Sequence, residues 1–363
     1  MKRVAFRTDA SLKIGTGHVM RCLTLANALR QVGAECAFIC REHEGNLIEF
    51  IAQQGFCVKT LPLSAAIDDT PYADWLGATS QADARQTIEA LSEFEPDWLI
   101  VDHYALDERW EKAMRAYCGR LMVIDDLAER SHDCDLLLDQ NLGRIDTDYD
   151  GLLNVDCKRM IGPKFALLRP EFAQLRQESL ERRREPCLKE LLITMGGVDQ
   201  NNATGAVLEA LKGCRLADDL HITVVMGPHA PWLESVQHLA TTMAWPTDVR
   251  TNVSDMAQLM TNSDLAIGAA GSTSWERCCL GLPSVTMVLA QNQVGIARAI
   301  ENEGATLILK STESSQVATE LLKILADIAR DSNILEIITQ SASKITNGCG
   351  SQRVVKKILE ISI

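Results

Sequence analysis

The sequence has no apolar stretch long enough to cross a membrane, because no run of about 18 apolar residues occurs in its 363 residues. A secretory signal is also missing, since MKRVAFRTDA has no apolar centre and reads as a first strand. Basic residues are outnumbered: 36 Lys and Arg stand against 49 Asp and Glu, a formal net charge of −13. The phosphate backbone of a nucleic acid would repel so acidic a chain. We therefore expect a cytoplasmic protein that binds neither membranes nor nucleic-acid polymers.

Metal-binding spacings and disulfide patterns are missing as well. The chain has no CxxC pair and no HExxH, so we expect no metal site. Its Trp residues are dispersed and form no base-stacking platform. The 12 cysteines are scattered, and many fall inside apolar runs such as ECAFIC (35–40). We interpret them as buried, reduced thiols.

What the sequence does contain is an alternation of strand-length apolar runs with segments of helical period. The first half predicts strands at 3–8, 35–40, 57–63, 97–103, 120–125 and 134–139, with helices between them at 18–32, 46–54, 81–94 and 107–118. The second half predicts strands at 190–195, 221–226, 264–269, 283–289 and 305–309, and only helices from 313 onward. Apolar strands joined by helices indicate parallel sheets covered on both faces. We expect an α/β protein with two Rossmann-like, doubly wound domains facing a cleft.

A change in composition indicates where the two halves meet. Residues 176–190 (RQESLERRREPCLKE) hold nine charged residues and a proline, which we interpret as a solvated helix leading into a linker. The length of the chain also favours two domains at about 150 residues each. We expect an N-terminal domain at 1–175, a C-terminal domain at 187–345 and a closing helix at 346–363.

The first predicted strand leads into a turn that ends in Gly15-Thr16-Gly17-His18. Two glycines let the backbone approach a ligand, and the helix that follows offers free N–H groups. The turn is neither a dinucleotide fingerprint, because Met20 stands in place of the third glycine, nor a P-loop. A histidine at this position can act as a general base near neutral pH, or it can simply cap or pack against the turn.

Polar residues also end other strands of the first half. Asp102, His103 and Tyr104 follow a buried strand, where three hydrogen-bonding side chains in succession are poor core filler. They could orient a sugar or a catalytic histidine. The next two strands end in Asp125, Asp126, Gln140 and Asn141. These residues could cap the following turns or contribute to the same site.

The second half has two glycine turns of its own. Gly196 and Gly197 follow the first strand of this half. Another turn runs through Gly271-Ser272-Thr273 and opens a helix. Small residues and hydroxyls at a helix N-terminus can hold a diphosphate without lysine. Glu276, one turn into that helix, could accept hydrogen bonds from a ribose diol or could be a solvated helix residue.

Read in order, these segments resemble the UDP-sugar hydrolases of pseudaminic acid biosynthesis. The matching segments are FRTD (6–9), IGTGHVMRC (14–22), VDHY (101–104), IDDL (124–127) through CDLLLDQN (134–141), GPKFALLRPEF (162–172) and MGG (195–197). The resemblance covers nearly the whole chain except the last helices. It implies a GT-B-like architecture in which the C-terminal domain holds UDP and the N-terminal domain presents a catalytic histidine to water.

The resemblance also implies a reaction and a set of residues. The substrate would be UDP-2,4-diacetamido-2,4,6-trideoxy-β-L-altropyranose, cleaved at its anomeric carbon to UDP and the free sugar without metal or cofactor. His18 matches the general base, and Asp9 or Asp102 would orient its imidazole. The substrate-binding residues would be Gly15, Gly17, His103, Tyr104, Asn141, Arg169, Gly196, Gly197, Gly271, Ser272, Thr273 and Glu276. Among these, Gly271–Thr273 and Glu276 match the diphosphate and ribose end.

Three other functions stay open at this point. A GT-B glycosyltransferase would move the sugar to an acceptor, and a hydrolysing UDP-N-acetylglucosamine 2-epimerase would share the fold and release UDP. A nucleotide-sugar-binding protein without catalysis would keep the second half's turns but have no use for His18. The His18 turn and the Asp102–Tyr104 segment favour the hydrolase. The oligomeric state is open, a monomer included.

Overall fold

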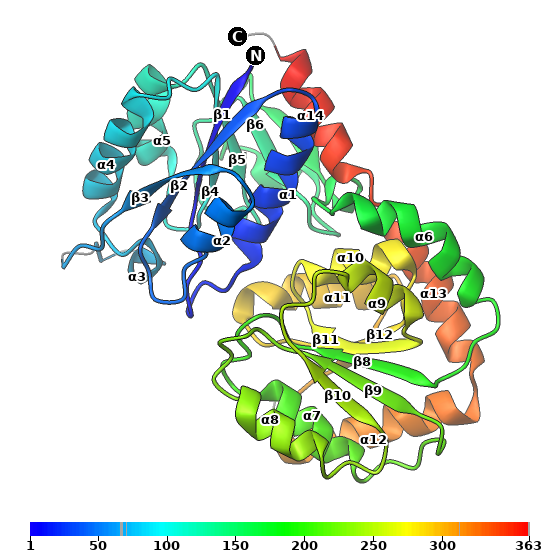
Figure 1. Ribbon diagram of the computed structural model, residues 1–363. Helices are drawn as coiled ribbons and strands as arrows, with labels where there is room; N and C mark the ends of the chain where they lie inside the picture. The colour runs from blue at the N-terminus through cyan, green and yellow to red at the C-terminus, as the bar shows by residue number, and fades with distance from the viewer. Residues whose placement is uncertain (66–67, 70, 312, 362–363) are drawn as a thin grey trace. The chain divides into compact units, whose positions relative to one another are not determined.

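The computed structural model describes residues 1–65, 68–69, 71–311 and 313–361 (Figure 1). The chain divides into two compact units. The first domain comprises Met1–Leu167 and Gly350–Ile363, and the second domain comprises Leu168–Cys349. The first domain therefore ends before the expected residue 175, and the last helix of the chain returns to it.

Within the described residues, the first domain is built on a seven-stranded parallel sheet in the order β3-β2-β1-β4-β5-β6-β7. The strands are β1 (Arg3–Thr8), β2 (Glu35–Arg41), β3 (Cys57–Leu61), β4 (Trp98–Asp102), β5 (Arg120–Ile124), β6 (Leu136–Asp139) and β7 (Lys158–Ile161). The helices are α1 (Gly17–Gln31), α2 (Ile48–Gln53), α3 (Ala73–Leu76), α4 (Ser80–Ser92), α5 (Glu108–Met114) and α14 (Gly350–Glu360), with 3-10 turns η1 (Arg115–Tyr117), η2 (Asp146–Tyr149) and η3 (Pro163–Phe165). The strand order reverses between β1 and β4.

The central strands of this sheet are buried on both faces, as their continuous apolar sequences predict. Val4 and Phe6 of β1 contribute to one hydrophobic cluster, which α1 and α14 also build. Ala5, between them in sequence, belongs to the cluster on the opposite face, with residues of α4 and α5. Successive side chains of a strand point to opposite faces, so β1 supplies both cores.

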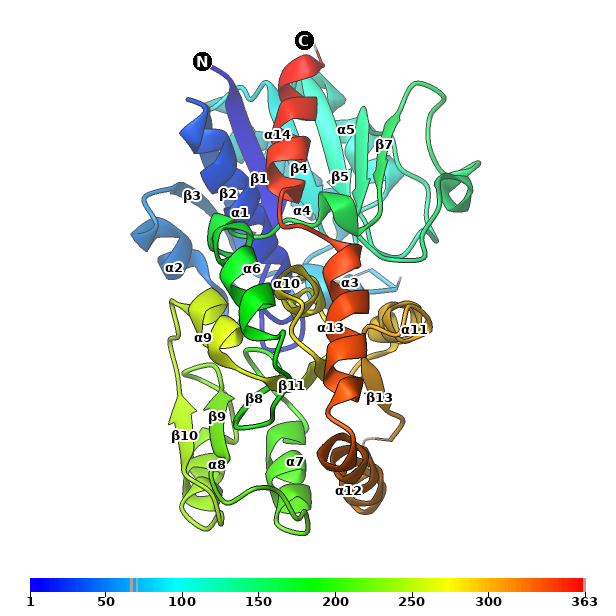
Figure 2. The same cartoon turned by 90° about the vertical axis from the view of Figure 1, so that its right-hand side faces the viewer.

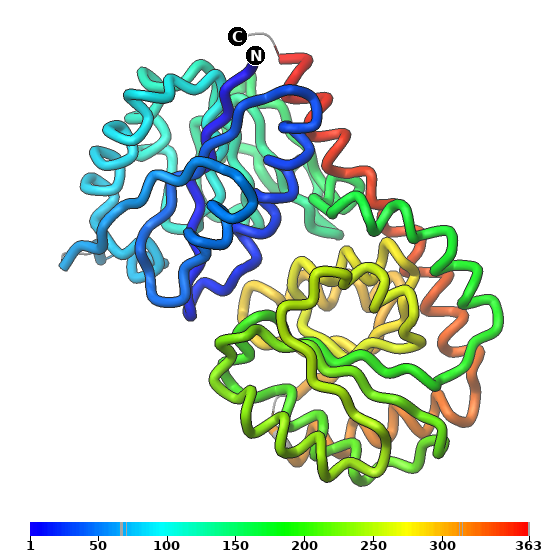
Figure 3. The backbone as a smooth tube through the Cα atoms, viewed as in Figure 1, coloured from blue at the N-terminus to red at the C-terminus, as the bar shows by residue number. Residues whose placement is uncertain are grey.

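Helix α14 packs beside α1 and closes one face of the first domain (Figure 2). The Lys2 ammonium donates a hydrogen bond to the Ile358 carbonyl at 3.3 Å, which joins the two ends of the chain (Figure 3). Gly350 begins the helix so close to η3 that a Cβ would lie 2.1 Å from the Ala166 carbonyl oxygen. Only glycine fits there, and the predicted closing helix belongs to the first domain.

In the described part of the second domain, six parallel strands follow the order β10-β9-β8-β11-β12-β13. The strands are β8 (Glu190–Thr194), β9 (His221–Val225), β10 (Thr247–Arg250), β11 (Leu265–Ala269), β12 (Ser284–Met287) and β13 (Leu307–Leu309). The helices are α6 (Pro170–Arg182), α7 (Ala203–Leu211), α8 (Leu233–Ala240), α9 (Met256–Asn262), α10 (Thr273–Leu280), α11 (Val294–Asn302), α12 (Ser314–Arg330) and α13 (Asn333–Ile345), with the 3-10 turn η4 (Gln291–Gln293). Here the strand order reverses between β8 and β11, and α7, α8 and α12 cover one face (Figure 1).

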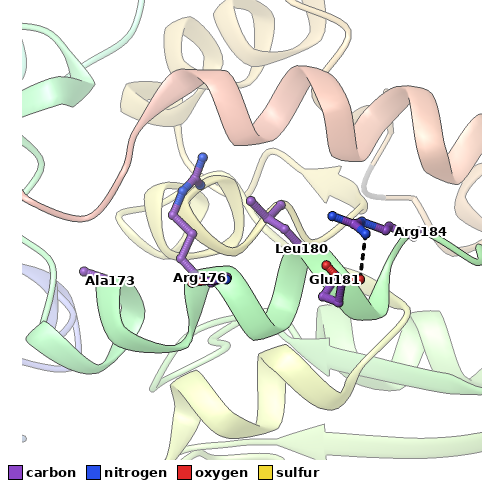
Figure 4. Close-up of a pocket in the computed structure, with 6 residues that line it drawn as sticks. Ala173, Arg176, Leu180, Glu181 and Arg184 are labelled. Atoms are coloured by element: carbon purple, nitrogen blue, oxygen red, sulfur yellow. Dashed lines mark ion pairs between the residues drawn. The ribbon is translucent and has the colours of Figure 1, made fainter.

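Helix α6 was expected to be solvated, but one arginine within it and one directly after it are structural. Arg176 donates to the carbonyls of Cys279, Ser343 and Thr346, at the C-terminal ends of α10 and α13. Figure 4 shows this side chain pointing away from α6. It is one of the residues that line a surface groove of about 380 Å³. Arg183, directly after α6, is 5% exposed and donates a hydrogen bond to the Met260 carbonyl near the C-terminal end of α9. Guanidinium groups offer several donors, so each satisfies helix-end carbonyls that have no partner of their own.

The predicted α/β class with two Rossmann-like domains is confirmed. Every strand predicted from an apolar run is present near its expected bounds, and the chain is helical from Ser314 apart from short connections. Sequence analysis missed β7 and β10, two edge strands. Among the described residues, no helix has both the length and the apolarity needed to span a membrane.

Candidate active site

Ligands of open α/β sheets bind beyond the carboxyl ends of the strands, where the strand order reverses. In the first domain that position lies between β1 and β4, whose last residues Thr8 and Asp102 are paired. The loop after β1 leads to His18 in the first turn of α1. In the second domain it lies between β8 and β11. The two glycine turns of the second domain follow these strands, so the His18 turn, Asp102 and both glycine turns lie where the strand order reverses.

His18 is held by a carboxylate and an arginine. Its Nδ1 lies 2.6 Å from Oδ1 of Asp102. Arg21, one helical turn further along α1, binds the same carboxylate through both oxygens, with Nε–Oδ2 at 2.6 Å and Nη2–Oδ1 at 2.7 Å. Residues three apart share one face of a helix, so α1 presents both side chains to the end of β4. The Asp102 side chain is fully buried.

This geometry fixes the proton on the imidazole. An ionised carboxylate only accepts, and a guanidinium only donates. Asp102 therefore accepts from both neighbours, and Nδ1 of His18 must carry the hydrogen that faces it. Nη2 of Arg21 also lies 3.3 Å from Nδ1, but both atoms are donors in this form, so among the described residues His18 has one hydrogen bond, from Nδ1 to Asp102. Its Nε2 then holds the free lone pair, which is the form that a general base requires.

The charge on Asp102 is stabilised by its partners. Burial alone would raise the pKa of this carboxyl. The charge of Arg21, together with the hydrogen bonds from Arg21 and His18, outweighs burial and holds the pKa well below its ordinary range. Asp102 is consequently ionised at any pH near neutrality and orients His18 as a fixed acceptor.

A second layer of hydrogen bonds surrounds this group. Oδ2 of Asp126 pairs with Nη1 of Arg21 at 2.8 Å and accepts a hydrogen bond from the Tyr104 hydroxyl at 2.8 Å. Asn141 donates to Asp126 at 3.2 Å. Tyr104 also places its ring edge-on to the His18 imidazole, with centroids 4.8 Å apart. The structure thus brings together Tyr104 and Asn141 around the arginine that positions His18.

Asp9 and His103 lie in a different, buried cluster. Asp9 accepts the Arg41 backbone N–H at 2.6 Å and pairs with Arg7 at 2.8 Å. Oδ2 of Asp9 is also 3.4 Å from Nε2 of His103, whose Nδ1 accepts the Ala105 N–H at 3.1 Å. Asp9 is therefore not the carboxylate that orients His18, which corrects that alternative. His103 is only 2% exposed, so it supports the loop from beneath and presents no face to a sugar.

The loop before α1 is tightly folded. The Ser11 hydroxyl accepts the N–H groups of Lys13 and Ile14, and the Ser11 carbonyl accepts that of Gly15 at 2.8 Å. Gly15 has φ +79°, a conformation that favours glycine, and open space where a Cβ would stand. Gly17 is the first residue of α1. The two predicted glycines therefore shape the approach to His18.

In the second domain the turn after β8 is also open. Gly196 has φ +93° and no atom within 4 Å of a Cβ position. The backbone of Gly197 packs closely against Gly227 in the loop after β9. A Cβ on Gly227 would lie 2.0 Å from the carbonyl oxygen of Gly197. Asp199 caps α7 by accepting the N–H groups of Ala203 and Thr204. This cap fixes the position of the two glycines.

The turn after β11 has the features of an anion site. Gly271 has open space at its Cβ position, with no positive φ. Among the described residues, no backbone acceptor takes the N–H groups of Gly271, Ser272 or Thr273. Free N–H groups at a helix N-terminus attract phosphate oxygens. Glu276 is 3.9 Å from Arg169, and burial raises the pKa of its carboxyl.

A buried cation lies beneath this turn. Arg277 is 1% exposed and donates to the Ala269 carbonyl at 2.9 Å and to the hydroxyls of Ser274 and Thr273. Its partners in the described part of the chain include no carboxylate at ion-pair distance. Burial lowers the pKa of Arg277, but the group remains a cation. Its positive charge therefore adds to that of the helix N-terminus.

Comparison with known proteins adds a family match in the second domain. Residues 191–347 match the glycosyltransferase family 28 C-terminal domain. Two curated relatives span most of the chain. An uncharacterized protein, MJ1062, of Methanocaldococcus jannaschii is 28% identical over 80% of this chain, which spans only 56% of that protein. The UDP-2,4-diacetamido-2,4,6-trideoxy-β-L-altropyranose hydrolase of Campylobacter jejuni is 27% identical over 83% of this chain and 97% of its own length.

Solved structures of the same fold include GT-B glycosyltransferases and UDP-N-acetylglucosamine 2-epimerases. MurG of Acinetobacter baumannii superposes with a TM-score of 0.69, covering 99% of this chain and 100% of that one at 15% identity. At that identity the likeness shows the fold. The chain has a GT-B-like fold and is distantly homologous to a UDP-sugar hydrolase.

Four residues of the two sites were missed from the sequence alone. Arg21 had a signal, because it follows His18 by three positions on a predicted helix. Asp126 was left open between a cap and a contributor to the site, and its role as the partner of Arg21 was not predicted. Arg277 follows Glu276 and had no signal, since burial of a lone guanidinium depends on tertiary packing. Trp75, whose ring lies 6.5 Å from that of His18, falls in a segment without clear periodicity.

Proposed function

We propose that this protein hydrolyses a UDP-sugar at its anomeric carbon, with His18 as the general base. The observation that carries the proposal is the imidazole held by Asp102 and Arg21 with Nε2 free, at the point where the strand order of the first domain reverses. The name of the Campylobacter jejuni relative, a hydrolase, supports this reaction class. It also makes UDP-2,4-diacetamido-2,4,6-trideoxy-β-L-altropyranose the first substrate to test.

The reaction needs one proton transfer and one displacement. Nε2 of His18 takes a proton from water while the water oxygen bonds to the anomeric carbon. The bond between that carbon and the β-phosphate oxygen breaks, and its electron pair leaves with UDP. Positioned general bases contribute about 10²–10⁴-fold to such reactions. Asp102 stabilises the imidazolium that forms, and no step draws on a metal or cofactor.

The second domain would hold the nucleotide. The N–H groups of Gly271, Ser272 and Thr273 would bind the diphosphate and stabilise the charge that develops as UDP leaves. Gly196 leaves room for the ligand beside them, and Glu276 would accept the ribose hydroxyls. The match to the glycosyltransferase family 28 C-terminal domain supports this division of roles.

The test is acceptor-free release of UDP from purified protein. We would incubate it with a panel of UDP-sugars in H₂¹⁸O and follow free UDP together with the position of the label. The proposal predicts UDP release from one or more members, with ¹⁸O in the sugar and none in UDP. Label in UDP would mean attack at phosphorus, which would overturn the mechanism.

The family match also favours a second candidate, a glycosyltransferase. A glycosyltransferase would release no UDP from the UDP-sugars of the panel until an acceptor is added. UDP release in the absence of any acceptor excludes it, and release that depends on an acceptor replaces the hydrolase proposal.

A further inference from the structure

Three aromatic side chains stand next to His18. The ring of Trp75 stacks on that of Tyr104, with centroids 5.6 Å apart and planes at 22°. Tyr72 contacts both rings, at 5.1 Å from Trp75 and 5.4 Å from Tyr104. The His18 imidazole is edge-on to Tyr104 at 4.8 Å and to Trp75 at 6.5 Å. We call Tyr72, Trp75 and Tyr104 the aromatic wall.

The aromatic wall does not belong to the hydrophobic cores of the first domain. Tyr104 is buried, but Tyr72 and Trp75 stay half-buried, and neither core cluster includes any of the three. Within the described residues the Trp75 indole N–H has no acceptor and is not among the buried unpartnered atoms, so it is open to solvent or to a ligand. A partly open aromatic surface with an unused donor is thus available beside the candidate base.

The backbone that leads to Trp75 is strained. Trp75 lies in α3, a single helical turn. Tyr72 precedes the turn at φ 60°, in the left-handed region that a bulky residue rarely adopts. Such strain persists only where the surroundings impose it, and it clusters at active sites and ligand clamps. The strain at Tyr72 therefore points to a functional role for the residues that it positions.

The other end of α3 is fixed just as closely. Gly77 follows at φ +64°, and a Cβ there would lie 2.6 Å from Cε1 of His43. Asp74 pairs with Lys13 at 3.1 Å, which ties α3 to the loop that leads to His18. The aromatic wall and the imidazole are consequently parts of one arrangement rather than two independent surface features.

We propose that the aromatic wall is the sugar subsite, and that the C–H face of the substrate's pyranose ring packs on Trp75. The inference rests on the proposed function, since it supplies a place for the sugar next to the His18 imidazole. The faces of a pyranose are apolar while its edges carry the hydroxyl and amide groups. A flat aromatic ring covers such a face, and the Trp75 N–H can bond a polar group at its edge.

The test separates sugar binding from nucleotide binding. We would measure KM and kcat for the best UDP-sugar of the panel, and Kd for UDP alone, in Trp75→Ala, Trp75→Phe and the wild type. Trp75→Ala is expected to raise KM about tenfold or more and to leave the Kd for UDP within twofold. Trp75→Phe keeps a ring and should recover most of the loss. Tyr117→Ala, which removes an exposed ring elsewhere in the domain, should change neither constant.

A fluorescence measurement covers the case in which Trp75→Ala does not fold. Tryptophan emission of the wild type should shift with UDP-sugar beyond any change with UDP, and Trp75→Phe should lose that additional shift. An unchanged KM in folded Trp75→Ala, or the same shift in Trp75→Phe, overturns the sugar subsite even where UDP release stands. Failure of the proposed function is a separate result: no UDP-sugar is hydrolysed, while UDP-N-acetylglucosamine binding, measured by calorimetry, still weakens in Trp75→Ala.

Discussion

Asp9 and Asp102 lie at the ends of two neighbouring strands but have different partners. Asp102 binds the imidazole of His18, whereas Asp9 binds Arg7 and the Arg41 backbone. The sequence placed both near the end of the sheet but could not assign the orienting role. Which carboxylate faces the histidine depends on side-chain directions at the end of β1 and β4, and these are set only when the strands pair.

Replacing each aspartate by asparagine tests this assignment. Asp102→Asn removes the charge and offers an amide that can no longer impose the Nδ1–H form, so kcat should fall about 10²–10⁴-fold with UDP affinity unchanged. Asp9→Asn breaks a buried ion pair, so it should destabilise the protein by about 3 kcal/mol and change kcat of the folded protein less than tenfold. Steady-state kinetics with melting curves measure both. A larger loss of kcat in Asp9→Asn would reverse the assignment.

Two buried groups should make stability depend on pH in opposite directions. Burial and the charge of Asp126 raise the pKa of Asp139 to about 7. The hydroxyl of Tyr149 lies 2.9 Å from Asp125 and 3.0 Å from Asp139, and its single proton can satisfy only one of them, which favours a protonated Asp139. Burial lowers the pKa of His103 to about 4.

The direction of each pH dependence follows from whether the folded or the unfolded chain binds the proton. Between about pH 4 and 7 the folded chain keeps a proton on Asp139 that the unfolded chain releases, so this group lowers stability as pH rises, by up to ~1.4 kcal/mol per unit. Between about pH 4 and 6.5 only the unfolded chain protonates His103, which raises stability as pH rises. Relative to the wild type, Asp139→Asn should gain stability with rising pH and His103→Gln should lose it. Melting curves from pH 4 to 7 that run parallel for all three proteins would contradict both.

At the scale of helices and strands, apolar runs identified the central strands and missed two edge strands that lack such a run. β7 (KRMI) and β10 (TDVR) are sheet edges, and their polar side chains carry no hydrophobic pattern. Helix α6 was recognised, but its role was not. Arg176 and Arg183 look like solvated charges in sequence, and only the ends of α9, α10 and α13 turn them into structural donors.

Two neighbouring arginines test the role of α6. Arg183→Met leaves buried carbonyls at the end of α9 without a donor, so we expect a loss of about 3 kcal/mol, or roughly 6–12 °C in melting temperature. Arg184→Met is the matched control, because this side chain is exposed and Glu181 is its one ion-pair partner in the described part of the chain. It should cost less than about 0.5 kcal/mol. Equal shifts in calorimetry would mean that α6 is a solvated helix after all.

The turn between β11 and α10 gives a prediction about binding. Gly271 has open space at its Cβ position and an ordinary φ, so Gly271→Val should change the melting temperature by no more than about 2 °C. Its side chain would occupy the volume in front of the N–H groups, so UDP affinity should fall at least about tenfold. Titration calorimetry with UDP measures this. Unaltered affinity would place the diphosphate elsewhere.

For the whole molecule, length and alternation predicted two domains, but not where the chain passes between them. The charged segment 176–190 suggested a boundary near residue 175, whereas the first domain ends at Leu167 and regains α14. The return of α14 depends on the close approach of Gly350 to Ala166. These residues lie far apart in the sequence, so no local sequence pattern predicts their contact. Likewise, the net charge of −13 argues against binding of polymeric nucleic acid, while the free N–H groups and buried Arg277 are the local features on which the proposed diphosphate site rests.

The central claim is that His18 activates water to release UDP. The most direct measurement compares acceptor-free UDP release by the wild type and by His18→Asn, with UDP binding by calorimetry on both. We predict that His18→Asn loses turnover by at least about 10²-fold and binds UDP as the wild type does. A His18→Asn protein that releases UDP at close to the wild-type rate would contradict the account.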